Sequence, residues 1–165
     1  MMQKKVQIIS DGSLDLSQEL TKEKDIEVVP FYVSFDSETY QKEMVEVGVR
    51  EFYQEMVDHP TVFPKTSMPS VHDYYEVFEK HAKEKMPVIC ICITRKFSGS
   101  LQSATTAKDM ILEEYPDAQI TVIDSTVNTV LQGLYVLEAC RLRDMGLEYQ
   151  QIVDALLPIR ETGRI

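Results

Sequence analysis

Continuous apolar segments alternate along this chain with segments in which apolar residues recur at helical spacing. Residues 88–93 form an uninterrupted apolar run, which is typical of a central parallel strand buried on both faces. The pattern also predicts strands over residues 6–10, 26–35 and 120–123, the second one broken or at an edge because it contains Pro30. It predicts helices over residues 48–57, 71–85, 100–115, 127–145 and 148–157. This alternation indicates an α/β fold, an open and mainly parallel sheet flanked by helices on both faces.

Glycine and proline set the expected limits of the later helices. Gly146 is expected to end the helix over residues 127–145, and Pro158 to break the last one, so that residues 1–158 form the predicted domain. Gly133 costs its helix about 1 kcal/mol relative to alanine, so we expect it to permit close packing on a neighbouring segment. Four residues are assigned to the apolar side of that helix: Val130, Leu131, Leu134 and Leu137.

The charge and the cysteines limit the classes of function. With 165 residues the chain fits one globular domain, and its formal net charge of −10 argues against a nucleic-acid partner, whose binding depends on clustered Lys and Arg. Cys90, Cys92 and Cys140 lie in apolar segments, which favours reduced thiols. Because neither a signal peptide nor a membrane-spanning segment is recognisable, we expect a cytoplasmic protein without a membrane span.

Two hydroxyl-rich segments are the most informative candidates for chemistry. Residues 64–70 read PKTSMPS and residues 94–100 read TRKFSGS, and each is expected to form a turn that precedes a predicted helix. Hydroxyls and free backbone N–H groups at a helix N-terminus suit a small anion such as a carboxylate or a phosphate. In an open parallel sheet, ligands bind beyond the carboxyl ends of the strands, where residues 10–13 and 124–126 place further polar side chains. The two segments could therefore share one anionic ligand.

The same polar residues also allow a simpler interpretation. Ser70, Ser98, Asp11 and Ser125 could cap helices and turns and do nothing else, as such residues do in most proteins. If they shape a site, we expect Asp11 and Asp124 to accept hydrogen bonds from backbone N–H groups of the turns that follow them. In that arrangement neither carboxylate would touch a ligand.

Catalysis by a serine and binding of a metal find little support in the sequence. Ser98 has a glycine only immediately after it and lacks the G-x-S-x-G spacing of hydrolase elbows. Cys90 and Cys92 on one strand are expected to point their sulfurs to opposite faces, and the histidines are too widely spaced for a zinc motif. We therefore expect no metal site. A catalytic base for Ser98 would have to be His59, His72 or His81. The sequence around each of them indicates no residue that would orient it as a base.

Several motifs occur in an order that matches a known family. Pro64–Ser70 is similar to a PKTSxPS box, and Phe97–Ala104, with the sequence FSGSLQSA, is similar to an LSGTYQSA box. Supporting matches are Val29-Pro30 with Tyr40, and Val122–Ser125. Through these motifs the chain resembles the N-terminal part of a DegV-family protein, a bacterial family of fatty-acid-binding proteins.

The resemblance implies a carrier, not an enzyme. The family holds one long-chain fatty acid whose carboxyl group is hydrogen-bonded by the Thr of the first box and the Ser of the second, which are Thr66 and Ser98 here. The supporting loop residues would be Ser67, Gly99 and Ser100, and neither a cofactor nor a metal is implied. In some bacteria such proteins present the acyl carboxylate to a separate kinase resembling dihydroxyacetone kinases. A fatty acid and such a kinase are therefore the expected partners.

Some positions depart from the family pattern. The family's common Asp-Ser near the first strand is Asp11-Gly12 here, and the Ser-Gly-Thr of the second box is Ser98-Gly99-Ser100. Family chains also continue into a second α/β domain, so residues 159–165 are expected to begin the linker to a missing second domain. Two other classes of function stay open. One is an enzyme that acts on a small phosphorylated metabolite at the helix N-terminus near Ser98, and the other is a regulatory protein-interaction module.

Overall fold

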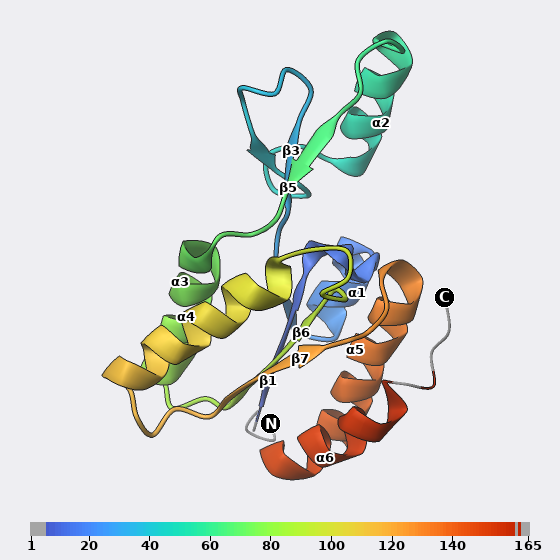
Figure 1. Cartoon of the computed structure of the whole chain (residues 1–165). Helices are drawn as coiled ribbons and strands as arrows, with labels where there is room; N and C mark the ends of the chain where they lie inside the picture. Colours follow the sequence, from blue (N-terminus) through green and yellow to red (C-terminus); the bar gives the residue numbers. More distant parts are fainter. Residues whose placement is uncertain (1–5, 161, 163–165) are drawn as a thin grey trace.

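The computed structural model describes residues 6–160 and 162, which form an α/β layer and a smaller lobe standing on one side of it (Figure 1). The α/β layer is built on a parallel sheet with the strand order β2-β1-β6-β7. The predicted central strand, β6, lies between β1 and β7, and β2 forms an edge, as expected from Pro30. The bounds are β1 (Gln7–Asp11), β2 (Ile26–Val29), β6 (Val88–Cys92) and β7 (Ile120–Asp124).

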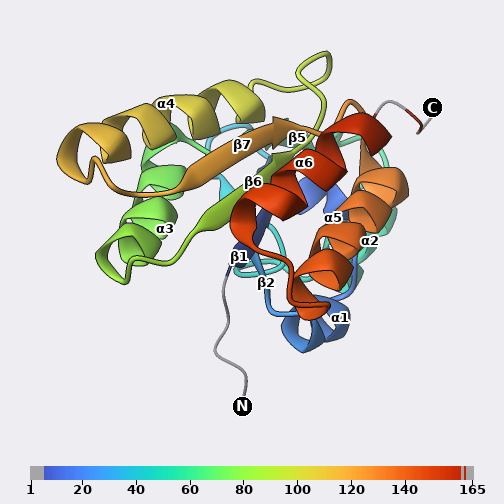
Figure 2. The same cartoon turned by 90° about the horizontal axis from the view of Figure 1, so that it is seen from below.

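Helices cover both faces of this sheet, because each face of a parallel sheet carries apolar side chains that must leave water (Figure 2). On one face α3 (Val71–Lys83) and α4 (Ser100–Glu114) bury Tyr74, Phe78 and Ile111 among other residues. On the other face lie α5 (Thr129–Asp144) and α6 (Tyr149–Ile159). The predicted α/β fold with helices on both faces is confirmed.

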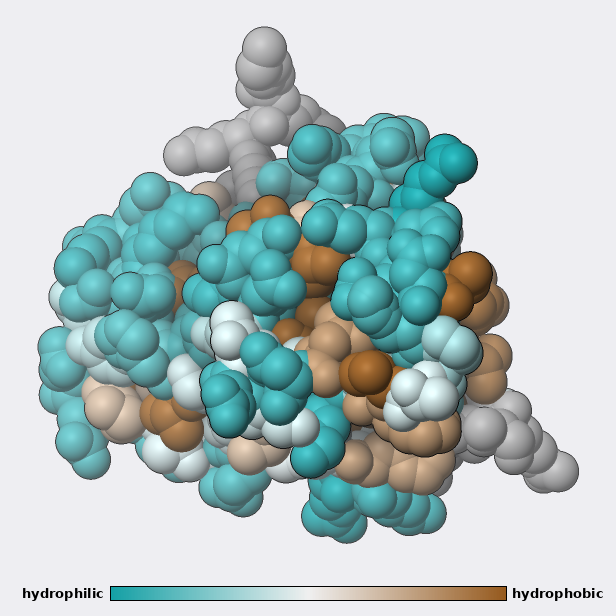
Figure 3. Space-filling model, turned by 90° about the horizontal axis from the view of Figure 1, so that it is seen from above, coloured by the Kyte–Doolittle hydropathy of each residue, from teal (hydrophilic) through white to brown (hydrophobic). Residues whose placement is uncertain are grey.

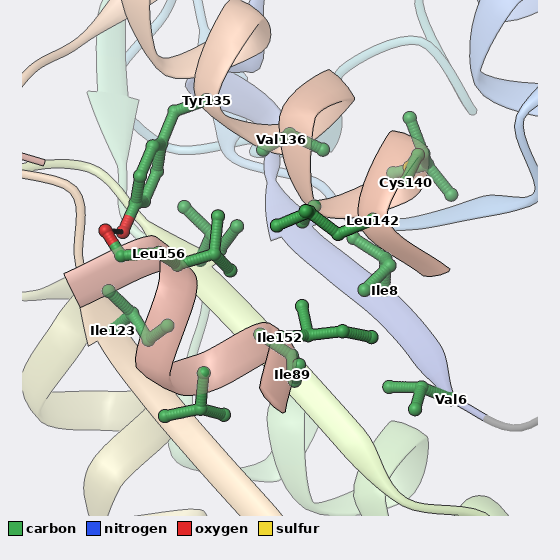
Figure 4. Close-up of a cluster of buried hydrophobic side chains, with 14 of the residues drawn as sticks. Val6, Ile8, Ile89, Ile123, Tyr135, Val136, Cys140, Leu142, Ile152 and Leu156 are labelled. Carbon is green, nitrogen blue, oxygen red and sulfur yellow. Dashed lines mark hydrogen bonds between the residues drawn. The ribbon is translucent and has the colours of Figure 1, made fainter. Parts of the chain in front are cut away.

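The core under α5 and α6 shows how the strands hold these helices (Figure 4). Ile8, Ile89 and Ile123 from three neighbouring strands contribute to one cluster with side chains of both helices. The hydroxyl of Tyr135 on α5 donates a hydrogen bond of 2.7 Å to the carbonyl oxygen of Leu156 on α6. The two helices are therefore joined by a polar contact inside an apolar core.

The buried face of α5 differs from the predicted one. Val130 is 58% exposed and Leu134 is 56% exposed, whereas Gln132 is completely buried. The reason is a polar network beneath the helix, described below, that requires the Gln132 amide on the inner face. The expectation for Gly133 is confirmed, because a Cβ atom there would lie 2.3 Å from the carbonyl oxygen of Leu14. The helix thus packs against the turn that follows β1.

The smaller lobe contains a second, antiparallel sheet that the sequence pattern did not predict. Its strand order is β4-β3-β5. Residues 26–35, predicted as one broken strand, divide into β2 of the large sheet and β3 of the small one, and residues 64–70, predicted as a turn, contain a strand. The elements are β3 (Tyr32–Ser34), β4 (Gln41–Lys42), β5 (Lys65–Ser67) and the helix α2 (Val49–Asp58).

The small lobe exposes many apolar side chains. Figure 3 views the lobe end-on and shows brown hydrophobic groups between the teal hydrophilic ones. No residue of the amphipathic helix α2 is buried, although the ring of Phe52 contacts that of Phe35 at a centroid distance of 5.2 Å. The exposed apolar residues of the lobe are Tyr40, Val45, Val49, Tyr53, Met56, Val57, Val62, Phe63 and Met68.

Three further features refine the predicted limits. A short 3₁₀ helix, η1 (Gly12–Leu14), and the helix α1 (Gln18–Glu23) follow β1 without having been predicted. Pro158 lies in the last turn of α6 and does not end the helix before itself. The predicted linker falls partly on residues 161 and 163–165, which lie outside the described part of the chain. No helix of the described residues is long and apolar enough to cross a membrane.

Candidate functional site

The side chain of Asp11 is completely buried at the carboxyl end of β1 and joins four segments. Its Oδ2 accepts hydrogen bonds from the backbone N–H of Ile93 (2.9 Å) and the hydroxyl of Ser100 (2.7 Å). Its Oδ1 accepts from Nε2 of Gln132 (2.8 Å) and lies 2.7 Å from Oγ of Ser13. The expected bond to a backbone N–H of its own following turn is therefore wrong for Asp11, whose backbone donor comes from the end of β6.

Asp124, at the end of β7, behaves as expected. Its Oδ1 accepts a hydrogen bond of 2.9 Å from the backbone N–H of Thr126 in the following turn. Its Oδ2 lies 3.6 Å from Nε of Arg95, an exposed side chain, and such surface pairs contribute little stability. The two strand-end carboxylates thus play different parts: one shapes its own turn, and the other connects distant segments.

A chain of polar groups leads from the core to Asp11. The Tyr74 hydroxyl lies 2.6 Å from Oγ of Ser100 and 3.7 Å from Sγ of Cys92, which in turn lies 3.8 Å from Sγ of Cys90. The two cysteines therefore point to the same face, contrary to expectation, because residues two apart on a strand share a face. Burial raises the pKa of both Tyr74 and Cys90, which keeps these groups protonated. As a carboxylate only accepts, Ser100 donates to Asp11, and Tyr74 donates to Ser100.

Ser98 lies half-buried in the turn between β6 and α4. The N-cap of α4 is Gly99, which has no side chain, and Oγ of Ser98 accepts a hydrogen bond of 3.1 Å from the backbone N–H of Ser100. This bond uses a lone pair of the hydroxyl and leaves its hydrogen free. Among the described residues, the Ser98 hydroxyl donates a hydrogen bond to no other group. Ser98 is therefore able to donate to a group from outside the chain.

Thr66 lies on β5 of the small lobe, where its backbone pairs with Val33 on β3. Its side chain is exposed and lines a cavity of about 760 Å³, and within the described part of the chain its hydroxyl has no hydrogen-bond partner. Ser98 is not among the residues that line this cavity. The apolar wall consists of Leu16, Val33, Met44, Val47, Val49, Phe52 and Tyr53, and Asp15, Glu19 and Glu43 supply acidic groups.

The two hydroxyl-rich segments touch through Met68 and Gly99. A Cβ atom on Gly99 would lie 2.6 Å from Sδ of Met68, so the methionine side chain packs directly on the glycine. The tip of the first segment thus lies against the turn that carries Ser98. Ser67 is also exposed, and strand alternation points it to the opposite face of β5 from Thr66.

A polar cluster around Asp73 fixes the small lobe to the start of α3. Asp73 closes a capping box with Ser70, and its Oδ1 accepts a hydrogen bond of 2.8 Å from the hydroxyl of Tyr32 on β3. Nζ of Lys42 on β4 lies 3.3 Å from the same oxygen. Burial alone would raise the pKa of Asp73, but the hydrogen bonds from Ser70 and Tyr32 outweigh it and lower the pKa below 3.8. This cluster orients the strands next to Thr66.

None of the three histidines approaches Ser98 as a base would. Each is paired with a glutamate: His59 with Glu55 at 3.7 Å, His72 with Glu76 at 3.4 Å and His81 with Glu27 at 2.6 Å. Within residues 6–160 and 162, no three side chains of His, Cys, Asp or Glu gather as metal ligands would. Among the described residues, no histidine is therefore placed to act as a base for Ser98.

A family model described as an uncharacterised protein of the DegV family matches residues 5–164. The chain belongs to the DegV family. A DegV domain-containing protein of Clostridium acetobutylicum is 33% identical over 153 residues, which cover 93% of this chain and 53% of that protein. The chain spans about half the length of the curated DegV relatives it matches.

Solved DegV structures have the same fold. A stearic-acid-binding protein from Eubacterium ventriosum matches with a TM-score of 0.88 and 46% identity, over 92% of this chain and 52% of that one. A DegV family protein from Thermus thermophilus, described by its fatty-acid binding, matches with a TM-score of 0.79 and 29% identity over 95% and 54%. The family predicted from the motifs is thereby confirmed.

Proposed function

We propose that this chain binds a long-chain fatty acid and holds the carboxyl group through hydrogen bonds from Thr66 and Ser98. The observation that carries the proposal is the Ser98 hydroxyl, whose oxygen accepts from the N–H of Ser100 while its hydrogen remains available to a ligand. The contact between Met68 and Gly99, which joins the two segments, supports a shared head-group site. The description of the Eubacterium ventriosum relative as stearic-acid-binding adds independent support.

Neutral donors are adequate for such a ligand. A carboxyl group that leaves water requires hydrogen bonds, and hydroxyls supply them whether the ligand is ionised or protonated. Acidic side chains, Glu43 among them, line the cavity beyond Thr66 and would repel an ionised head group. Burial raises the pKa of Glu43, whose Oε1 accepts a hydrogen bond of 3.0 Å from the backbone N–H of Phe31. We therefore place the head group at the hydroxyls, away from Glu43.

The apolar wall of the cavity suits the acyl tail. Val33, Val47 and Phe52 lie on this wall near Thr66, and burial of each methylene contributes about 0.8 kcal/mol. The tail would then supply most of the affinity and the hydroxyls the orientation. Shortening a saturated fatty acid by two carbons should therefore weaken binding by up to about 1.6 kcal/mol, measured by displacement of a fluorescent fatty acid. An affinity independent of chain length would contradict this.

The head-group assignment is tested by native mass spectrometry and by two alanine variants. Protein purified from bacteria should carry a fatty acid, and Thr66→Ala and Ser98→Ala together should weaken binding by about 1–3 kcal/mol, roughly 5- to 150-fold in Kd. Thr61→Ala and Thr106→Ala remove hydroxyls of similar exposure elsewhere and should bind like the wild type. Binding unchanged in the double variant would refute the roles of Thr66 and Ser98. Displacement of the fatty acid by inorganic phosphate would favour a phosphorylated metabolite instead.

The same proposal includes presentation of the carboxyl group to a separate kinase. In this scheme the chain carries the ligand, and the kinase, which would resemble dihydroxyacetone kinases, transfers the phosphoryl group from ATP to the carboxylate. The loaded protein with ATP alone should yield no acyl phosphate, and addition of such a kinase should yield it. Acyl phosphate formed without the kinase would show that this protein is itself the enzyme.

A further inference from the structure

We infer that Asp11 is a positioning residue for the fatty-acid head group: through Ser100 it fixes the Ser98 hydroxyl that donates to the ligand. The inference rests on the function proposed above. It concerns a residue that does not touch the ligand, because Asp11 is completely buried and all its contacts are with the protein.

The acceptor sites of Asp11 are all engaged. An ionised carboxylate has about four lone-pair directions, and four donors surround this one. The hydroxyl hydrogen of Ser13 is shared, since its oxygen lies 2.7 Å from Oδ1 of Asp11 and 2.6 Å from Oε1 of Gln132. The bonds from Ile93 and Ser100 occupy Oδ2. No direction is left for a ligand, so any effect of Asp11 on binding must pass through its neighbours.

Ser100 is the neighbour that transmits the effect. It is the first residue of α4, and its hydroxyl donates to Asp11 over 2.7 Å while its backbone N–H donates to Oγ of Ser98 over 3.1 Å. Tyr74 fixes the same hydroxyl from the other side at 2.6 Å. A change at Asp11 is therefore expected to move Ser100, and with it Ser98, the proposed donor to the head group.

Stability alone does not account for this arrangement. No lysine or arginine of the described residues pairs with Asp11, and a buried carboxylate without a cation is costly. The carboxylate instead fixes how three segments lie relative to one another, because it accepts hydrogen bonds from the end of β6, the start of α4 and the inner face of α5.

The test separates positioning from general stability by the preference for an acid over an alcohol. Affinities for palmitate and for hexadecan-1-ol are measured on delipidated protein by displacement of a fluorescent fatty acid. Asp11→Asn places an amide N–H₂ group against the donors that now bind the carboxylate. Ser100→Ala removes the hydroxyl that links Asp11 to the Ser98 turn. Both variants should lower the ratio of palmitate to hexadecanol affinity about tenfold, the scale of one hydrogen bond to a charged group, with hexadecanol affinity unchanged.

The matched control is Ser125→Ala. Ser125 is completely buried like Ser100 and also follows a strand, but its hydroxyl bonds only Val127 within its own turn. Its variant should lose stability and keep the wild-type ratio. An equal fall of the ratio in Ser125→Ala would overturn the inference, because any cavity beneath the sheet edge would then have the same effect.

The failure of this inference differs from the failure of the proposed function. If Ser98→Ala lowers the ratio and Asp11→Asn and Ser100→Ala do not, the head-group site stands and the positioning role is wrong. If the wild type itself shows no preference for palmitate, both are wrong. Should Asp11→Asn fail to fold, Ser100→Ala alone decides, since it removes the link and leaves the other bonds of Asp11 in place.

Discussion

Replacement of Gly133 by alanine tests the packing that brings α5 against the turn after β1. A Cβ atom at this position would lie 2.3 Å from the carbonyl oxygen of Leu14 and 2.8 Å from Cδ2 of Leu16. Ordinary van der Waals contacts of a Cβ atom begin at 3.4 Å, so the carbonyl oxygen must retreat by about 1 Å. The Leu16 side chain can rotate away, but a backbone carbonyl moves only with its whole turn.

Two opposing effects set the magnitude. Alanine in place of glycine favours the helix by about 1 kcal/mol, and overpacking of a dense interior costs about 1–3 kcal/mol. The upper part of that range applies, because the displaced turn, η1, contains Ser13, which contacts both Asp11 and Gln132. The free energy of unfolding of Gly133→Ala should therefore fall by about 1–2 kcal/mol.

Urea denaturation followed by circular dichroism measures this change. The control is Gly48→Ala, since a Cβ atom on Gly48 meets no atom within 4 Å and the residue has a negative φ of −81°. Its free energy of unfolding should stay within about 0.5 kcal/mol of the wild type. A Gly133→Ala protein as stable as the wild type, or more stable, would show that η1 does not press on α5 and would refute the reasoning.

Two further predictions concern hydrogen bonds between distant segments. Burial would raise the pKa of Glu27, but hydrogen bonds from His81 and Lys80 outweigh this effect and hold the pKa below its ordinary value of 4.5. The stabilisation of the folded protein by these bonds is therefore present above pH 4.5 and is lost as the pH falls through the lowered pKa. Glu27→Gln should lower the free energy of unfolding by about 1 kcal/mol at neutral pH and flatten its acid dependence, and an unchanged acid profile would contradict this. Tyr135→Phe removes the bond to Leu156 and should cost about 1 kcal/mol in urea denaturation, whereas wild-type stability would show that this bond contributes nothing.

The elements that the sequence predicted well are those with a strong local signal. β6 is completely buried along Val88–Cys92, and an uninterrupted apolar run of this length is the usual pattern of a central strand in a parallel sheet. The start of α3 could also be predicted. Ser70 stands directly before the apolar repeat, and in the structure it caps the helix. In both cases the residues that define the element lie next to one another in the sequence.

The small lobe lacked such a signal. All three residues of β5, Lys65–Ser67, are exposed and polar, and β4 has only two residues. Short polar strands form here because β3 offers a partner on each side, and its pairing with β5 joins segments far apart in the chain. The hydroxyls of Thr66 and Ser98 could therefore be singled out by family motifs. The turn that carries Ser98 was expected from the sequence, but the strand that carries Thr66 was not.

The sequence contains a signal for Gln132, the partner of Asp11 on α5, but the apolar pattern of the helix indicates a different inner face. Gln132 lies 121 residues from Asp11, and a glutamine followed by Gly133 looks like a weak point in an otherwise apolar helix. Physically the two residues act together: the glycine lets α5 approach η1, and only at that distance does the glutamine amide reach the buried carboxylate. Because a buried carboxylate requires donors, the helix turned Gln132 inward and left Val130 and Leu134 in water. In α5, the polar residue beside the glycine therefore marks the inner face, and the apolar positions Val130 and Leu134 do not.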